Sequence, residues 1–315
     1  VPKFIESLKV KGRSPSTVIA YRADLEQLVA FLLNKNKPLL EQVLSSDLES
    51  FRDTLLSQKY TPKSVSRKLN AVKTFFRWLV SEGLSTTDAS TAVSHPKVES
   101  SLPKFLSQLE YRALRDVVRA DTRIAAMIEL ILQTGMRISE VANLKTADVK
   151  DGTVKVEAYA TQAERTIPLN KPAKDALDTY LINRPKVESE YVFISKTGKP
   201  IAVRNIRAAI DRYMQRAEIP NYSVNDLRTT FMIESIKAGV DLVLLSQVSG
   251  HKRLSTTERY LELAGVTESG KRQTLNATMD SLGNGSYRWP SGFLRLLNDQ
   301  VFLVYSESAG DGTPP

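Results

Sequence analysis

The side chains best suited to chemistry lie in the latter part of the chain. His251 stands nine residues before Tyr260, and the segment between them is polar and basic. Arg137 and Arg228 lie further upstream, each close to residues that predict the start of a helix. Guanidinium and imidazole groups can donate hydrogen bonds to phosphate oxygens, and a phenol can act as a nucleophile. Gathered around one phosphorus, these four side chains could attack a phosphodiester, and no metal ion would be required.

Three segments carry a resemblance to a known family. They read TGMRISE at 134–140, NDLR at 225–228 and SGHKRLSTTERY at 249–260. Together they resemble the catalytic boxes of the tyrosine recombinases, the integrase and Xer group. Two earlier stretches, 14–25 and 67–79, are similar to the helical core-binding domain of Xer-type recombinases, so the resemblance covers about residues 10 to 270.

The resemblance implies a role for each of the four side chains. Arg137 and Arg228 would bind the non-bridging oxygens of the scissile phosphate, and His251 would donate to a third oxygen or bridge to one of them. Tyr260 would form a 3′-phosphotyrosyl bond, which a 5′ hydroxyl from another strand then reverses. Such an enzyme needs neither ATP nor another cofactor, and the chain has no Walker-type glycine-lysine run.

The chain departs from the family pattern at a predicted hairpin. Family members carry a lysine at its tip that protonates the leaving 5′ oxygen, whereas the tip here, 158–163, contains none. Tyr159 stands near the expected position, and a phenol of pKa ~10 could donate a proton only if it were aimed correctly. Lys155 on the preceding strand could reach in, although we interpret it as a solvated strand residue.

A second departure concerns Asn225, which occupies the position where the family usually has histidine. An asparagine can donate a hydrogen bond to a phosphoryl oxygen, but it cannot exchange a proton near neutral pH. Any base function at this position is therefore lost or carried elsewhere. The alternative is that Asn225 only caps its helix.

Composition favours a globular protein with a polyanionic partner. The chain has 315 residues, 42% of them hydrophobic, which suffices for two domains. Its net charge of +9 at pH 7 favours nucleic acid. It has no cysteine and two histidines, which leaves no thiolate site and little for a histidine-rich metal site. No apolar run approaches the ~20 residues that cross a bilayer, so we expect a cytoplasmic, nucleoid-associated protein without a membrane partner.

Residues 1–94 are predicted to form a helical DNA-binding domain. Ser14 followed by Pro15 indicates a helix start, and further helices are expected over 46–56 and from Pro62 onward. The last of these carries a basic face, which is either solvated or available for phosphate contacts in a DNA groove. That face comprises Lys63, Arg67, Lys68, Lys73 and Arg77.

Residues 95–104 have the composition of a linker, and 105–265 are predicted to form the catalytic domain. A buried helix over 124–132 is expected to end at Gly135, which would place Arg137 in a turn. Alternating residues over 152–157 and 164–169 predict a hairpin, and the run 191–194 predicts a third, buried strand. A helix with outward Arg204, Arg207 and Arg212 should follow.

The expected fold is mainly α with a small β-sheet, in which an N-terminal helical bundle and a mixed α/β catalytic domain form a C-shaped clamp around DNA. Residues 266–315 are expected to form a C-terminal tail, a candidate segment for docking in trans on a neighbouring protomer. The family resemblance implies a homotetramer acting on double-stranded DNA with two specific recombination sites.

Three functions are consistent with these patterns. The first is a site-specific recombinase that performs integration, excision or resolution of mobile DNA or replicon dimers. The second is a catalytically weakened or inactive DNA-binding protein of the same fold, because the lysine and the first histidine are missing. The third is a relaxing activity like that of type IB topoisomerases, which use similar chemistry without paired sites.

Overall fold

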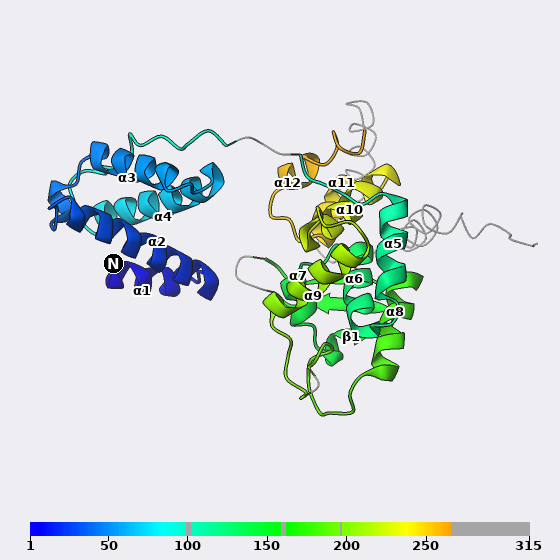
Figure 1. The fold of residues 1–315 in the computed structure, drawn as a ribbon. Helices are drawn as coiled ribbons and strands as arrows, with labels where there is room; N and C mark the ends of the chain where they lie inside the picture. The colour runs from blue at the N-terminus through cyan, green and yellow to red at the C-terminus, as the bar shows by residue number, and fades with distance from the viewer. Residues whose placement is uncertain (99–101, 159–161, 196, 266–315) are drawn as a thin grey trace, which may run out of the picture. The chain divides into compact units, whose positions relative to one another are not determined.

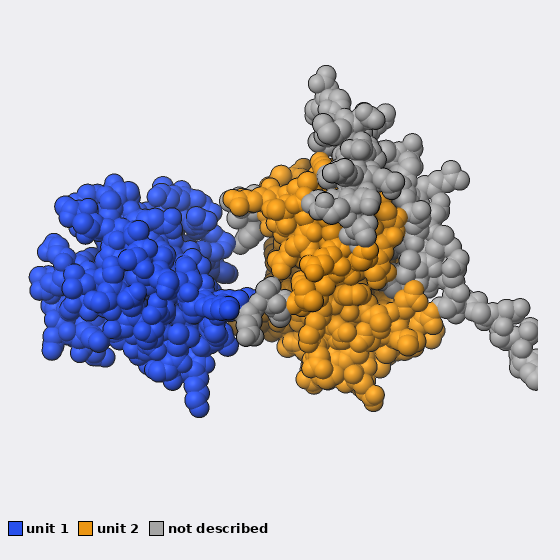
Figure 2. All heavy atoms as spheres, turned by 90° about the horizontal axis from the view of Figure 1, so that it is seen from above, with its two compact units in different colours: residues 1–101 blue, residues 102–315 orange. Residues whose placement is uncertain are grey.

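A computed structural model describes residues 1–98, 102–158, 162–195 and 197–265. Figure 1 shows a chain of many helices with one small sheet. The chain divides into two compact units, Val1–Ser101 and Leu102–Pro315, which Figure 2 colours separately. The division falls within the expected linker. Tyr159 and the predicted tail lie outside the described residues.

Unit 1 is helical over its described residues. Its elements are α1 (Pro2–Val10), α2 (Pro15–Asn34), the short 3-10 helix η1 (Leu40–Gln42), α3 (Ser45–Ser57) and α4 (Pro62–Ser81). Ser14 caps α2 as predicted, because its side chain accepts a hydrogen bond from the backbone N–H of Thr17 at 3.3 Å. Thr61 caps α4 in the same way. The predicted helices of this unit are therefore confirmed.

Aromatic rings form the centre of the unit 1 core. Phe4 of α1 packs against Phe75 and Trp78 of α4, with ring centroids 5.3 Å and 5.5 Å apart. Leu69 and Val72 on the same face of α4 are buried. This apolar stripe fixes α4, and the basic residues that alternate with it are thereby distributed between solvent and the edge of the core.

Unit 2 is organised around α6 (Thr122–Thr134), most of whose residues are buried. The helix ends at Gly135, which has a left-handed φ of 64°, and a Cβ there would collide with the ring of Phe231. The surrounding helices are α5 (Gln108–Val118), α7 (Ile138–Ala142), α8 (Lys171–Asn183), α9 (Val203–Arg216), α10 (Val224–Lys237), α11 (Leu242–Val248) and α12 (Ser255–Glu258), with the 3-10 helix η2 (Thr146–Asp148).

The sheet of unit 2 is antiparallel, in the order β1 (Val149–Lys150), β2 (Thr153–Val156) and β3 (Arg165–Pro168). The register pairs Val156 with Arg165, so β2 and β3 form the predicted hairpin. The prediction of a third strand at 191–194 is wrong. Val192, Phe193 and Ile194 are fully buried, but this run contributes only isolated bridges. An apolar run in the sequence indicates that a segment is buried. It does not show that the segment pairs with a neighbouring strand.

Candidate active site

Arg137 stands at the junction between the central helix and α7. Its backbone N–H donates to Glu140 Oε2 at 2.8 Å, which starts α7 and fixes the direction in which the arginine side chain leaves. Its Nη1 donates to Glu140 Oε1 at 3.0 Å, Gln162 Oε1 at 3.0 Å and the carbonyl of Ser249 at 3.2 Å. Its Nη2 donates to the carbonyl of Gly250 at 3.0 Å. Arg137 is therefore held against the loop that leads into His251.

Arg228 reaches the same loop from α10. Its Nη2 donates to the Ser249 carbonyl at 2.6 Å, and its Nη1 donates to the carbonyl of Gly135. Burial of the guanidinium, followed by repulsion from Arg137, lowers the pKa of Arg228 to about 9. The group is still charged at neutral pH. Two guanidiniums therefore converge on one carbonyl, although 91 positions separate them in the sequence.

His251 is neutral in this arrangement, and its tautomer follows from its partners. Nε2 lies 3.0 Å from Arg228 Nη2, and a guanidinium has no acceptor, so Nε2 must offer its lone pair. The ring proton is therefore on Nδ1, which donates to Thr257 Oγ1 at 2.8 Å. Burial and the charges of Arg228 and Arg137 lower the pKa of His251 to about 4. The imidazole can serve as a donor toward phosphate only after a change of tautomer or uptake of a proton.

Tyr260 follows α12 and packs against the core of unit 2. The guanidinium of Arg259 lies over its ring, 5.9 Å from the centroid. The Tyr260 hydroxyl has no hydrogen-bond partner among the described residues. These residues therefore do not engage the oxygen that the sequence predicts as the nucleophile.

A buried ion pair supports the two arginines, and the sequence analysis missed it. Arg165 of β3 donates through Nη1 and Nη2 to the two oxygens of Glu140, at 3.0 Å and 2.7 Å, and through Nε to the carbonyl of Val248 at 2.6 Å. Burial would raise the pKa of Glu140, but the hydrogen bonds and charge of Arg165 outweigh it and hold that pKa below its usual value. The sequence signal that could have revealed this pair is Glu140, an acidic residue three positions after Arg137 at an expected helix start.

Gly250 is required where the loop passes these arginines. Its φ is +63°, and a Cβ would lie 3.0 Å from Arg165 Nη1 and 3.2 Å from Arg137 Nη1. A side chain at this position would be strained by the backbone and crowded by two guanidiniums. The glycine therefore lets the loop approach both cations closely.

The structure does not bring every predicted site residue into contact. Asn225 is exposed at the start of α10, one turn before Arg228, and its side chain makes no hydrogen bond within the described part of the chain. The alternative that Asn225 caps the helix is wrong, because Ser223 is the N-cap and pairs with Asp226. Lys155 forms an exposed ion pair with Glu164 at 3.0 Å, consistent with a solvated strand residue.

The basic face predicted on α4 is smaller than expected. Lys63 and Arg77 are exposed and Lys73 is partly exposed. Lys68 is buried, because its ammonium donates to Asp24 Oδ1 at 2.9 Å and Gln27 Oε1 at 2.7 Å, so its assignment to the exposed face is corrected. Arg67 is half exposed and binds both oxygens of Asp24.

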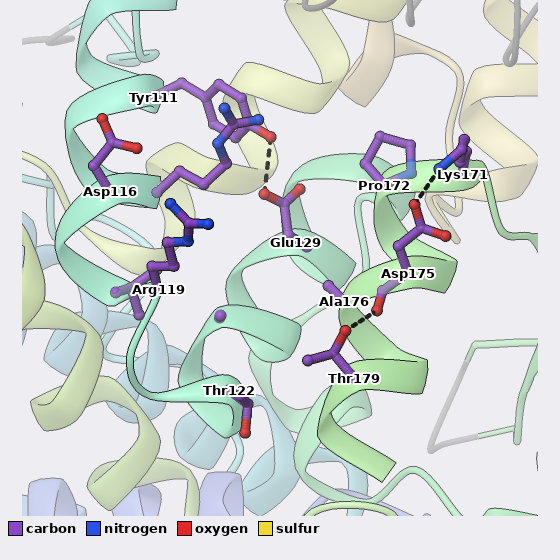
Figure 3. Close-up of a pocket in the computed structure, with 13 residues that line it drawn as sticks. Tyr111, Asp116, Arg119, Thr122, Glu129, Lys171, Pro172, Asp175, Ala176 and Thr179 are labelled. Carbon is purple, nitrogen blue, oxygen red and sulfur yellow. Dashed lines mark hydrogen bonds and ion pairs between the residues drawn. The ribbon is translucent and has the colours of Figure 1, made fainter. Parts of the chain in front are cut away.

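A separate groove of about 630 Å³ lies between α5, α6 and α8 (Figure 3). Glu129 at its floor accepts a hydrogen bond from the Tyr111 hydroxyl at 2.8 Å. Burial raises the pKa of Glu129. None of the side chains predicted to act in chemistry lines this groove. It is therefore distinct from the arginine cluster, by which we mean Arg137, Arg165 and Arg228 with Glu140 and His251.

The described residues show neither a metal site nor a membrane-spanning helix. They contain no group of three or more His, Cys, Asp or Glu side chains placed to hold a metal ion. None of the described helices combines the length and the apolar character needed to cross a bilayer.

Comparisons with known proteins identify relatives in sequence and in fold. The tyrosine recombinase XerC of Oceanobacillus iheyensis is 30% identical over 275 residues, which cover 82% of this chain and 90% of the relative. XerC of Lactobacillus leichmannii is 31% identical over 277 residues, covering 83% and 93%. Among solved structures, the Tn1549 transposon integrase in complex with transposon right-end DNA has a TM-score of 0.70 at 16% identity, covering 88% of this chain and 97% of that one. A lambda integrase dimer bound to a core site has a TM-score of 0.66 at 18% identity, covering 81% and 94%.

Family models match both units of the chain. Residues 1–83 match the N-terminal SAM-like domain of phage integrases, and residues 104–265 match the phage integrase family. These matches cover the helices of unit 1 and every side chain of the arginine cluster. The chain belongs to the phage integrase family, the tyrosine recombinases.

Proposed function

We propose that this protein is a site-specific DNA recombinase that cleaves and rejoins DNA through a 3′-phosphotyrosyl intermediate on Tyr260. The observation that carries the proposal is the convergence of Arg137 and Arg228 on the Ser249 carbonyl, with His251 bound to Arg228. Cations held this close together without a carboxylate for each are suited to receive an anion. The membership of the family and the names of its relatives supply the reaction type.

The chemistry follows from the charge on the phosphodiester. As the Tyr260 oxygen forms its bond to phosphorus, the bond to the 5′ oxygen breaks, and negative charge accumulates on the non-bridging oxygens. Arg137 and Arg228 are held on the same carbonyl by the protein, so both positive charges are in place to stabilise that negative charge. Removal of one such donor typically costs about 2.7–4 kcal/mol of transition-state stabilisation. The phenol loses its proton in the step, and the departing 5′ oxygen gains one.

Few side chains of the described site can donate or accept a proton during cleavage. His251 is neutral with its proton turned toward Thr257, and Asn225 does not titrate. General acid–base catalysis typically contributes about 10² to 10⁴-fold, so cleavage should be slower than in relatives that retain the lysine and the first histidine. A substrate with a 5′-bridging phosphorothioate, whose leaving group needs no acid, should therefore be cleaved faster than the ordinary substrate.

The proposed partner is double-stranded DNA that carries specific recombination sites, bound by a homotetramer. A lambda integrase tetramer bound to a Holliday junction has the same fold, with a TM-score of 0.67 at 17% identity. In unit 1 we propose Lys63, Arg67, Lys73 and Arg77 as phosphate contacts. The two units would close on the duplex as a clamp, and a protein with this substrate would associate with the nucleoid.

The decisive experiment uses a nicked suicide substrate that traps the covalent adduct. Wild-type protein should form an adduct that is resistant to denaturant, and Tyr260→Phe should form none while its DNA affinity is unchanged. An adduct that persists in Tyr260→Phe would overturn the assignment of the nucleophile.

The second candidate is a DNA-binding protein with little or no cleavage. It is favoured by Asn225 and by the contacts of Arg137 Nη1 with three protein acceptors. The same experiment separates the two functions, because this candidate binds DNA and gives no adduct even with Tyr260 present.

A further inference from the structure

Gln162 enters the arginine cluster from the hairpin, three residues before β3. Its Oε1 lies 3.0 Å from Arg137 Nη1. Because a guanidinium only donates hydrogen bonds, the contact requires the oxygen of the carboxamide to face Arg137 and fixes how the amide is turned. Nε2, the donor end, has no hydrogen-bond partner among the described residues. One end of the side chain is therefore anchored and the other is unused.

Arg137 does not need Gln162 for its own satisfaction. Nη1 has two hydrogens, and Glu140 Oε1 and the Ser249 carbonyl already lie within hydrogen-bond distance of it. Glu140 is also the acceptor for Arg165, and the Ser249 carbonyl is shared with Arg228, so both are fixed parts of the framework. Gln162 is the one neutral and partly exposed acceptor of the three. Because Arg137 already has enough acceptors, the contact with Gln162 is better explained by a role of Gln162 itself.

We propose that Gln162 is a catalytic residue, whose carboxamide remains anchored on Arg137 through Oε1 and donates through Nε2 to a non-bridging oxygen of the scissile phosphate. This inference rests on the proposed function of the same site. A phosphate bound by Arg137 would lie next to the guanidinium that also binds Gln162 Oε1. Gln162 Nε2 would therefore be placed near the substrate. Gln162 transfers no proton, because a carboxamide does not ionise near neutral pH, and the proton of the 5′ oxygen comes from another group.

The first test is single-turnover cleavage at saturating DNA. Gln162→Ala should cleave about 100-fold more slowly than wild type, which is the typical effect of removing one oriented donor, and its DNA affinity should be unchanged. Gln162→Glu keeps the size and the acceptor but lacks the donor, so it should cleave at least as slowly as Gln162→Ala. Glu164→Ala on the same hairpin, whose carboxylate forms an exposed ion pair with Lys155, is the matched control and should cleave like wild type.

The second test separates direct contact from support of the fold. Substrates with a methylphosphonate at the scissile position replace one non-bridging oxygen by methyl in each diastereomer. On the diastereomer that lacks the contacted oxygen, Gln162→Ala should cleave as fast as wild type, and on the other diastereomer the deficit should persist. A residue that only supports the fold would give the same deficit on both.

Two results would overturn the inference while leaving the proposed function intact. One is cleavage by Gln162→Ala at or above the wild-type rate, which would mean that Gln162 competes with the phosphate for Arg137. The other is an equal deficit on both methylphosphonates. If wild-type protein forms no Tyr260 adduct, the proposed function itself has failed, so the two failures are distinguishable.

Discussion

Each unit contains a carboxylate that faces two cations, and the two groups differ in what is left over. In unit 1, Asp24 holds Arg67 and Lys68. In unit 2, Glu140 holds Arg137 and Arg165, but Arg228 lies beside them without an acidic partner among the described residues. The unit 1 group joins two helices and ends there. In the unit 2 group, Arg228 contacts carbonyl oxygens and His251 and makes no ion pair with a carboxylate among the described residues, so this group has one more cation than its carboxylate pairs with.

The carboxylates themselves give the largest contrast. Breaking a buried ion pair from one side typically costs about 3–5 kcal/mol of unfolding free energy, so Asp24→Asn and Glu140→Gln should both destabilise the protein. Only Glu140→Gln should also slow cleavage at saturating DNA, because it releases Arg137 as well as Arg165. Urea unfolding and single-turnover cleavage measure the two effects. Cleavage by Glu140→Gln at the wild-type rate would show that Glu140 serves stability alone, as Asp24 does.

Protonation of His251 in unit 2 should make stability depend on pH. The folded pKa of His251 is about 4, whereas an unfolded histidine has a pKa of about 6.5. Between these values the unfolded chain binds more protons, so stability should fall as pH is lowered through this window and recover as it is raised. His251→Gln should flatten this part of the profile, because glutamine does not titrate. Unfolding by urea at several pH values checks it, and an unchanged slope in the variant would contradict a neutral, buried imidazole.

The smallest expected effect concerns the helix α4. Arg77→Ala should weaken DNA binding uniformly across sequences and reduce the slope of log affinity against log salt by about 1, as expected for loss of one phosphate contact. Lys68→Gln should leave that slope unchanged, because the Lys68 ammonium is held by Asp24 and Gln27. Filter binding over a salt series measures both. A reduced slope for Lys68→Gln would mean that this side chain leaves the interior to meet DNA.

The two units also differ in how far their sequences reveal them. Helix starts were predictable from local signals such as Ser14, Thr61 and Ser223, because caps act over three residues. The position of Lys68 was not, because the partner that draws it inward, Asp24, lies 44 residues away. The spacing of residues along a helix predicts which side chains share a face, but it does not reveal whether an oppositely charged residue from another helix lies next to that face.

In the active site, the same limit separates the residues found from those missed. Arg137, Arg228, His251 and Tyr260 were singled out because their neighbours in sequence match a family pattern. Arg165 and Gln162 have no such local signature, and each contacts its partner across 25 positions or more. The strand predicted at 191–194 was wrong for a related reason, since apolar residues indicate burial but not strand pairing, and among the described residues this run forms only isolated bridges.

The carbonyl of Ser249 accepts hydrogen bonds from both arginines, so one short loop positions both of them. Replacing residues 249–251 as a block would reset the alignment of both guanidiniums and the imidazole in a single step. For anyone redesigning specificity or grafting this chemistry onto another helical scaffold, the unit to transplant is this loop together with its receiving arginines, and exchanging one arginine at a time would leave its companion misaligned.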